Sequence, residues 1–270
     1  MTSIAERTAQ FRHLHADGLL LLVNAWDAGT ARLMESLGSR AIATTSAGVA
    51  WAHGYRDGDE LPVSRLFDTV ESTARVINVP LTVDIEGGYS DNPDDVADTV
   101  LQLVARGASG INLEDGALPP HALAAKIARI RARCSEAGVD VFINTRTDVW
   151  LRQLAEPGAP RVAAALERAH LYRDAGADGL FVPGVTEPDE IAAIASQAGL
   201  PLNILWRATL PDHATLQELG VRRLSAGSLL AESVAGHLRQ RAQTFLDAPR
   251  LQADPLAMSY GELNALFPPA

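Results

Sequence analysis

Six polar side chains lie in or just after three consecutive apolar segments of the sequence. They are Asp84 and Glu86, Asn112 and Glu114, and Asn144 and Arg146. Side chains two residues apart on a strand point to the same face, so we predict that each pair projects to one side. If the three strands are neighbours in a sheet, they lie about 4.8 Å apart and bring the pairs together. Such a set suits a site that binds a metal ion and a carboxylate.

The charge of this predicted cluster requires compensation. Two carboxylates about 4 Å apart repel by about 4 kcal/mol at an effective dielectric constant of 20. Arg146 offsets one charge, and the remainder requires a divalent cation or a carboxyl group with a raised pKa. No His or Cys occupies these positions, and oxygen ligands favour Mg²⁺ or Mn²⁺ over zinc. The alternative is a structural network in which the carboxylates cap helices or pair with Arg146.

The elements that must position these residues alternate along the chain. Eight short apolar segments predict strands, at 19–23, 41–45, 81–84, 110–114, 141–146, 179–184, 202–207 and 222–227. Amphipathic stretches between them predict helices, several of which end in Gly. This alternation predicts an α/β fold, a (β/α)8 TIM barrel formed by one domain over residues 1–270. Catalytic residues of such barrels lie at the C-terminal ends of the strands, where the polar pairs fall.

Composition excludes several classes of partner and cofactor. The formal charge is −10, from 33 acidic and 23 basic residues, and no basic cluster is present, which argues against nucleic acid and anionic membranes. Cys134 is the only cysteine, so one chain can form neither a disulfide framework nor a thiolate zinc site. With no signal-like N-terminus or apolar run of membrane length, we expect a cytoplasmic protein. The only lysine, Lys126, falls in a predicted helix, which argues against a Schiff-base aldolase.

Residues 253–267 follow the eighth unit and predict a C-terminal helical extension. This segment carries six large apolar side chains, Leu256, Met258, Tyr260, Leu263, Leu266 and Phe267. A surface helix with that content needs a surface to cover it. We expect it to dock on its own barrel or on a second copy of the chain in a homo-oligomer.

Several motifs resemble those of the isocitrate lyase and phosphoenolpyruvate mutase superfamily. They are NAWD (24–27), TTSAGVAWAHGYRDGD (44–59), VDIEGGYSD (83–91), GINLED (110–115), INTRTD (143–148) and DAGADGLFVPG (174–184). The resemblance implies a (β/α)8 barrel that binds Mg²⁺ and acts on 2-oxo acids or their enols at a C–C or C–P bond. It also implies a dimer or tetramer that exchanges a C-terminal helix between subunits.

The resemblance assigns roles by position. Metal-site carboxylates correspond to Asp84, Glu86 and Glu114, with Asp57 as a further acidic residue. Glu86 stands where the family more often has Asp. The loop that holds the substrate carboxylate or enolate oxygen corresponds to Thr45, Ser46 and Ala47. Arg146 corresponds to the arginine that binds a substrate carboxylate, a role that suits its planar fork.

Polar residues at other strand ends are weaker candidates for substrate binding. Trp26 and Asp27 end the first predicted strand and are two of these candidates, and Asp27 either caps the next helix or contacts the substrate loop. Asn144 is a further candidate for substrate binding. Asn203, Arg207 and Ser225 could contact the distal part of a substrate, although packing explains them equally well.

The sequence departs from the family at the proton donor. Isocitrate and methylisocitrate lyases carry a Lys-Lys/Arg-Cys-Gly-His segment after the fourth strand, where this chain reads EDGALPPHALAAK. Cys134 lies further on in a helical stretch and is predicted to be a packing residue. The longer gating loop of phosphonomutases is also missing. The sequence therefore predicts a Mg²⁺-dependent lyase that cleaves a C–C bond of a small 2-oxo or 2-hydroxy carboxylate through a metal-stabilised enolate. The alternatives are C–P bond chemistry, and a catalytically weak 2-oxo acid binding protein.

Overall fold

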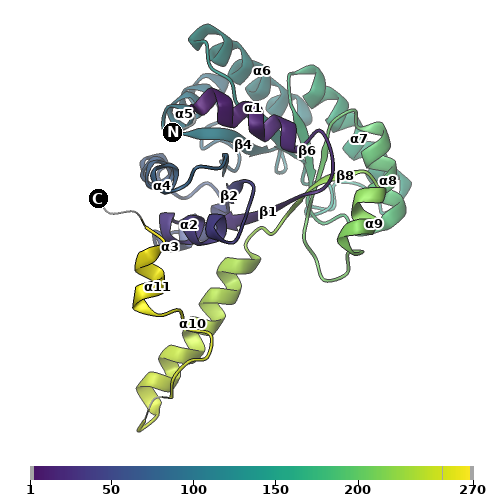
Figure 1. Cartoon of the computed structure of the whole chain (residues 1–270). Helices are drawn as coiled ribbons and strands as arrows, with labels where there is room; N and C mark the ends of the chain where they lie inside the picture. The colour runs from purple at the N-terminus through teal and green to yellow at the C-terminus, as the bar shows by residue number, and fades with distance from the viewer. Residues whose placement is uncertain (1–2, 251, 268–270) are drawn as a thin grey trace.

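Eight parallel strands close into a barrel in chain order, as Figure 1 shows from one side. The computed structural model describes residues 3–250 and 252–267. The strands are β1 (Leu20–Ala25), β2 (Ile42–Thr44), β3 (Leu81–Asp84), β4 (Ala108–Glu114), β5 (Phe142–Arg146), β6 (Gly179–Val182), β7 (Leu202–Leu205) and β8 (Val221–Ser225). Pairing of Leu20 with Arg223 joins β1 to β8 and closes the sheet. The predicted (β/α)8 barrel and its eight strands are confirmed.

Helices surround the barrel and connect its strands. They are α1 (Ile4–Leu14), α2 (Ala28–Ser36), α3 (Ser46–Ala52), α4 (Val63–Val76), α5 (Pro93–Ala105), α6 (Pro120–Ala137), α7 (Ala159–Asp174), α8 (Pro188–Gln197), α9 (His213–Glu218), α10 (Leu229–Asp247) and α11 (Tyr260–Ala265). Their ends follow local sequence signals. Asp27 accepts a hydrogen bond from the Thr30 N–H at the start of α2, and Gly138 ends α6 in the left-handed conformation that glycine tolerates.

Helix α1 closes the N-terminal end of the barrel. Phe11 is fully buried and lies so close to Gly110 that a Cβ on that glycine would be 2.8 Å from the phenyl ring. His15 follows α1 and stacks on Phe142 with ring centroids 4.3 Å apart. Helix α1 therefore covers the barrel interior at the end opposite the polar strand ends.

The C-terminal extension departs from the barrel. Figure 1 shows α10 projecting away from the sheet, and the chain then returns through α11 toward α2. The return is anchored where the Arg32 guanidinium donates to the Leu266 carbonyl at 2.6 Å. Within the predicted extension 253–267, only Tyr260–Ala265 is helical, because the segment before it forms turns around Asp254 and the Ser259 cap. Among the residues that the structure describes, no helix is long and apolar enough to cross a membrane.

Candidate active site

A pocket of about 170 Å³ lies at the C-terminal ends of the strands. It is lined by Asn24, Thr45, Ser46, Ala47, Asp57, Asp84, Asn112, Arg146, Leu151, Phe181, Pro183, Leu205, Ser225, Gly227 and Ser228. Ligand pockets for drug-sized molecules usually measure about 300–1,000 Å³, so this one suits a smaller molecule. It combines the carboxylates of Asp57 and Asp84 with the guanidinium of Arg146, whereas the predicted carboxylates Glu86 and Glu114 are not part of its lining.

Strand register brings together five of the six side chains that were predicted to converge, all except Glu86. Asp84 on β3 pairs with Asn112 on β4, and Asn112 pairs with Asn144 on β5. One layer further toward the C-terminal end, Glu114 pairs with Arg146. Asn144 donates to the Asn112 side-chain oxygen at 2.9 Å. Residues far apart in the sequence thus form one polar layer across the barrel.

Asp84 is the buried carboxylate of the pocket. Its backbone N–H donates to the Thr44 hydroxyl at 2.8 Å, and its Oδ1 accepts from the Glu86 N–H at 3.1 Å. The Asn112 amide lies 3.5 Å from Oδ2. Burial raises the pKa of Asp84, whereas Arg146 opposes that increase. A cation in the pocket would stabilise the charged form of this residue.

Glu86 does not continue the strand face of Asp84. Strand β3 ends at Asp84, and Glu86 adopts a left-handed backbone conformation with φ +51°, so the spacing rule for strands stops applying before it. Its Oε2 accepts hydrogen bonds from the N–H groups of Gly58, at 2.8 Å, and Asp59, and Oε1 accepts from the Tyr89 hydroxyl at 3.0 Å. Burial raises the pKa of Glu86 to about 7.

Arg146 is held by two carboxylates and still has hydrogen-bond donors to offer. Its Nη1 lies 2.5 Å from Glu114 Oε2, and Nε and Nη2 lie 2.7 and 3.1 Å from the oxygens of Asp148. The hydrogen bonds to Asp148 use two of the five N–H groups of the guanidinium, and the contact of Nη1 with Glu114 is an ion pair. Because Arg146 lines the pocket, the N–H groups that remain on its terminal nitrogens can bind a substrate carboxylate. Burial raises the pKa of Glu114 to about 8 despite Arg146.

The other predicted residues divide between the pocket and its surroundings. Thr45, Ser46, Ala47 and Asp57 line the pocket, and the first N–H groups of α3 have no partner within the helix. Asp27 caps α2, which was one of its two predicted roles. The pocket lining does not include Trp26, Asp27, Glu86, Glu114, Asn144 or Asn203.

Below the pocket lies a buried arginine that the sequence analysis did not single out. Arg223 on β8 is fully buried, and its guanidinium donates to Ser225 Oγ at 3.0 Å and to Asn112 Oδ1 at 3.3 Å. Ser225 in turn donates to Asn203 Oδ1 at 3.1 Å. In the described part of the chain, the third nitrogen of Arg223 has no hydrogen-bond partner. The sequence signal that could have identified Arg223 is its charge within an apolar strand, two positions before Ser225 and therefore on the same strand face.

A second network that was missed fixes the loops after β4 and β5. The buried Asp115 carboxylate accepts from the Tyr172 hydroxyl at 2.7 Å, from Arg168 at 3.1 Å and from the Asp148 N–H at 2.9 Å. Asp148 then holds Arg146. The position of Arg146 is therefore determined by groups from α7 as well as from the strands. Only the pairing of loop and helix in space reveals this, because Asp115 and Tyr172 are distant in the sequence.

The donor set fits a hard divalent cation. Asp84 and Asp57 are carboxylates that line the same pocket, and Asp84 is buried with a raised pKa. Among residues 3–250 and 252–267, no three His, Cys, Asp or Glu side chains are arranged to hold a metal ion together. Mg²⁺ usually takes one or two carboxylates and completes its shell with water and substrate oxygens. The three predicted carboxylates Asp84, Glu86 and Glu114 thus do not converge as one set of direct ligands.

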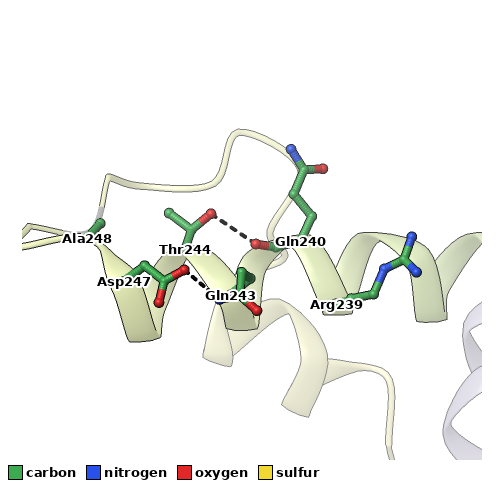
Figure 2. A pocket seen from close by; sticks show the side chains of 6 residues that line it. All are labelled: Arg239, Gln240, Gln243, Thr244, Asp247 and Ala248. Atoms are coloured by element: carbon green, nitrogen blue, oxygen red, sulfur yellow. Dashed lines mark hydrogen bonds between the residues drawn. The ribbon is translucent and has the colours of Figure 1, made fainter.

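A larger hollow, of about 580 Å³, lies along α10 and has a different character. Figure 2 shows its six lining residues, Arg239, Gln240, Gln243, Thr244, Asp247 and Ala248. The Thr244 hydroxyl donates to the Gln240 carbonyl, and the Gln243 amide lies 2.5 Å from Asp247. These partners belong to the same exposed helix, so the hollow has no converging catalytic groups.

Comparison with known proteins identifies the family. A model of the phosphoenolpyruvate phosphomutase family matches residues 11–246. The chain belongs to the phosphoenolpyruvate phosphomutase family. An uncharacterised Mycobacterium tuberculosis protein is 38% identical over 261 residues, which are 94% of this chain and 95% of that protein. An oxaloacetate decarboxylase of a Bradyrhizobium strain is 33% identical over 206 residues, 74% of this chain and 70% of that enzyme.

Solved structures agree with this membership. The crystal structure of a candidate phosphonomutase from Burkholderia cenocepacia superposes with a TM-score of 0.85 at 39% identity, over 90% of this chain and all of that one. The family resemblance stated from the sequence motifs is confirmed. The relatives of this chain include lyases and mutases that act on small carboxylates. The chain is therefore an enzyme of the isocitrate lyase and phosphoenolpyruvate mutase superfamily.

Proposed function

We propose that the protein is a Mg²⁺-dependent lyase that cleaves a C–C bond of a small 2-oxo or 2-hydroxy carboxylate. The observation that carries the proposal is the single pocket in which Asp57 and Asp84 lie together with the unused N–H groups of Arg146. A cation and a substrate carboxylate can occupy such a pocket together, because each finds groups of opposite charge. Oxaloacetate is the first substrate to test, since a relative is named oxaloacetate decarboxylase.

Each residue of the pocket has a role in this proposal. Arg146 binds the substrate carboxylate, while Glu114 and Asp148 hold the guanidinium in position. The N–H groups of Ser46 and Ala47, at the start of α3, meet the oxygen on which negative charge develops, a contribution of about 3–4 kcal/mol per donor in well-studied enzymes. Asp84 and Asp57 would hold Mg²⁺, with Glu114 nearby as a further acidic group. When bound, the ion supplies Lewis-acid stabilisation of the enolate that C–C cleavage releases.

Other members of the fold support the choice of ligand for a first test. A phosphonopyruvate hydrolase that shares the fold, with a TM-score of 0.83 at 23% identity, was crystallised with oxalate and Mg²⁺. Oxalate is a planar dianion that resembles the enolate of pyruvate. Thermal unfolding should be followed with EDTA, with Mg²⁺, with oxalate and with both ligands. A ligand that binds only the folded state raises its stability by mass action.

The expected result is a much larger stabilisation by Mg²⁺ and oxalate together than by either alone. Turnover of oxaloacetate, substituted malates and phosphonopyruvate should then be screened. Phosphorus-containing products would favour the alternative of C–P bond chemistry. Phosphonopyruvate is included in the screen because the chain is 39% identical to a candidate phosphonomutase. Binding without turnover would favour the 2-oxo acid binding protein. No effect of either ligand would contradict the proposal.

The extension at the C-terminus supports a homo-oligomer, a dimer or tetramer in which α10 and α11 contact a second copy. Val234, Leu238 and Phe245 are exposed and lie on one face of α10, at spacings of four and seven residues. A contiguous exposed apolar face is typical of an interaction surface. Helix exchange between subunits and a cytoplasmic location stay predictions from the sequence.

A further inference from the structure

Two loops at the mouth of the pocket exchange hydrogen bonds through two carboxylates. One loop, residues 53–62, connects α3 to α4 and carries Asp57. The other, residues 85–89, follows β3. Each loop contributes one carboxylate that accepts hydrogen bonds from backbone N–H groups of the other loop.

Glu86 forms one half of this arrangement. Its Oε2 accepts from two consecutive N–H groups, those of Gly58 and Asp59, and its Oε1 accepts from Tyr89. Asp59 forms the other half, because its Oδ1 accepts from the Tyr89 N–H at 3.3 Å. A Cβ on Gly87 would lie 3.0 Å from Asp59 Oδ2, so the absence of a side chain at position 87 allows the close approach.

The backbone in both loops requires such restraint. Asp59, Glu86 and Tyr89 have φ values of +59°, +51° and +58°, in the left-handed region that residues other than glycine rarely adopt. Such conformations persist only where the surrounding structure holds them. The 85–89 loop is also fixed from outside, because the Lys126 ammonium donates to the Gly87 carbonyl at 2.7 Å. The 85–89 loop is thus the anchored partner, and the 53–62 loop is the one being held.

Asp57 depends on this arrangement for its place at the pocket. It is exposed, and it lies one residue before the two N–H groups that Glu86 accepts. Within residues 3–250 and 252–267, the hydrogen bonds that join residues 56–60 to the rest of the protein run to the 85–89 loop. Nothing else of this kind holds Asp57 over the cavity that it lines.

We propose that Glu86 is a positioning residue that holds Asp57 at the pocket by its bonds to Gly58 and Asp59, and that its reach matters more than its charge. The role of Asp57 rests on the proposed function, whereas the loop contact does not. Aspartate has the same charge as glutamate and a side chain that is one methylene group shorter. Shortening the side chain by about 1.5 Å would withdraw the acceptor from both N–H groups.

Glu86→Asp and Glu86→Gln separate reach from charge. Asp keeps the charge and loses the reach, whereas Gln keeps an oxygen at the same reach and loses the charge. Glu35→Asp is the matched control, because Glu35 Oε1 also accepts from two consecutive N–H groups, of Asn78 at 2.6 Å and Val79 at 3.1 Å, away from the pocket. The readout is amide hydrogen exchange of residues 53–62 in metal-free protein, with thermal unfolding of each variant.

In Glu86→Asp, we expect exchange of the 53–62 loop to accelerate about tenfold or more, because the loop loses both of its hydrogen bonds to the side chain at position 86. Glu86→Gln should stay within about threefold of the wild type, and Glu35→Asp should leave this loop unchanged. Gly87→Ala, which crowds Asp59 without a change of backbone region, should accelerate exchange in the same loop. Unchanged protection in Glu86→Asp and Gly87→Ala, or equal loss in Glu86→Gln and Glu86→Asp, overturns the proposal.

Turnover provides the second readout. Glu86→Asp should lower kcat more than it raises KM, and addition of Asp57→Asn should lower kcat little further, because Glu86 acts through Asp57. If the loss of kcat in the double variant equals the product of the losses in the two single variants, Glu86 does not act through Asp57 and its positioning role is overturned. If no substrate is turned over, the proposed function fails, while the exchange experiment still decides the loop contact by itself.

Discussion

Arg146 Nη1 lies 2.5 Å from Glu114 Oε2, and the two residues are register partners on β5 and β4. The sequence placed them in separate roles, one on the metal and one on the substrate. Their contact places the Glu114 carboxylate against the guanidinium, where it restrains the position of Arg146. Arg146 also donates hydrogen bonds from Nε and Nη2 to the Asp148 carboxylate, which complete its support.

Arg146→Lys should lower kcat/KM about 100-fold or more, because the lysine keeps the charge but loses paired hydrogen bonds that contribute about 1.5–3 kcal/mol each. Steady-state kinetics with the substrate from the screen would measure the change. Arg152→Lys is the control, since Arg152 contacts the same Asp148 at 3.3 Å from a half-exposed position. Equal losses in both variants would contradict a substrate contact by Arg146.

Mg²⁺ affinity should rise with pH between about 6 and 8. Burial raises the pKa of Glu86 to about 7 and that of Glu114 to about 8, so in the metal-free protein at pH 7 Glu114 is mostly protonated and Glu86 is about half protonated. Binding of the cation favours their charged forms and therefore releases protons. For each proton released, the Mg²⁺ affinity rises by up to about tenfold per pH unit.

Calorimetric titration in two buffers of different ionisation enthalpy would count the released protons. Glu114→Gln should release fewer protons than the wild type. An affinity that is independent of pH in this range would show that these carboxylates do not sense the metal.

Arg223→Met should weaken oxalate binding about tenfold, because a positive charge is lost below the pocket floor. Stability should stay within about 2 kcal/mol of the wild type, since replacement of a buried, incompletely paired charge by an apolar side chain is often near neutral. Arg223→Lys keeps the charge and should bind oxalate more tightly than the Met variant. Isothermal titration and urea unfolding measure the two quantities, and equal oxalate affinity in both variants would refute the charge effect.

The protein should lose stability as pH falls below about 6.5, in part through His15. Burial, with Arg223 as the next cause, lowers the pKa of His15 to about 3. The unfolded chain binds a proton at this residue below its ordinary pKa of about 6.5 while the folded chain does not, which removes about 2 kcal/mol at pH 5.

Urea unfolding at pH 7.5 and 5 would test this. His15→Gln should reduce the difference in free energy of unfolding between the two pH values by about 2 kcal/mol. His13→Gln, at an exposed position of the same helix, should leave it unchanged. A wild-type pH dependence in His15→Gln would show that the residue titrates normally in the folded protein.

Leu238→Glu combined with Phe245→Glu should lower the oligomer mass measured by light scattering after size exclusion. Both side chains are more than 60% exposed in the single chain, at 64% and 69%, and charges there oppose burial in an interface. Gln240→Glu changes charge at a polar position of the same helix and should leave the mass unchanged. An unaltered mass in the double variant would place the contact elsewhere.

Local sequence patterns were sufficient for the fold and for part of the site. Apolar strands such as 81–84 alternate with amphipathic helices, and this periodicity depends only on neighbours in the chain. Strand-end positions then placed Asp84, Asn112 and Asn144 in one layer and Glu114 with Arg146 in the next, because neighbouring parallel strands in chain order carry these residues at paired positions. The packing role predicted for Cys134 agrees with its burial on α6.

Local sequence patterns could not predict which side chains contact one another outside the strands. Glu86 left the strand face because its backbone turns into the left-handed region, and its partners come from a loop 28 residues earlier. Arg223 and Asp115 meet Asn112 and Tyr172 only after closure of the barrel. The sequence by itself determined the barrel, the family and the chemical types at the strand ends, since these follow from periodicity and from residue identity. The tertiary structure decided which carboxylates face the pocket and which hold its loops, because hydrogen bonds depend on distances that only the folded chain sets.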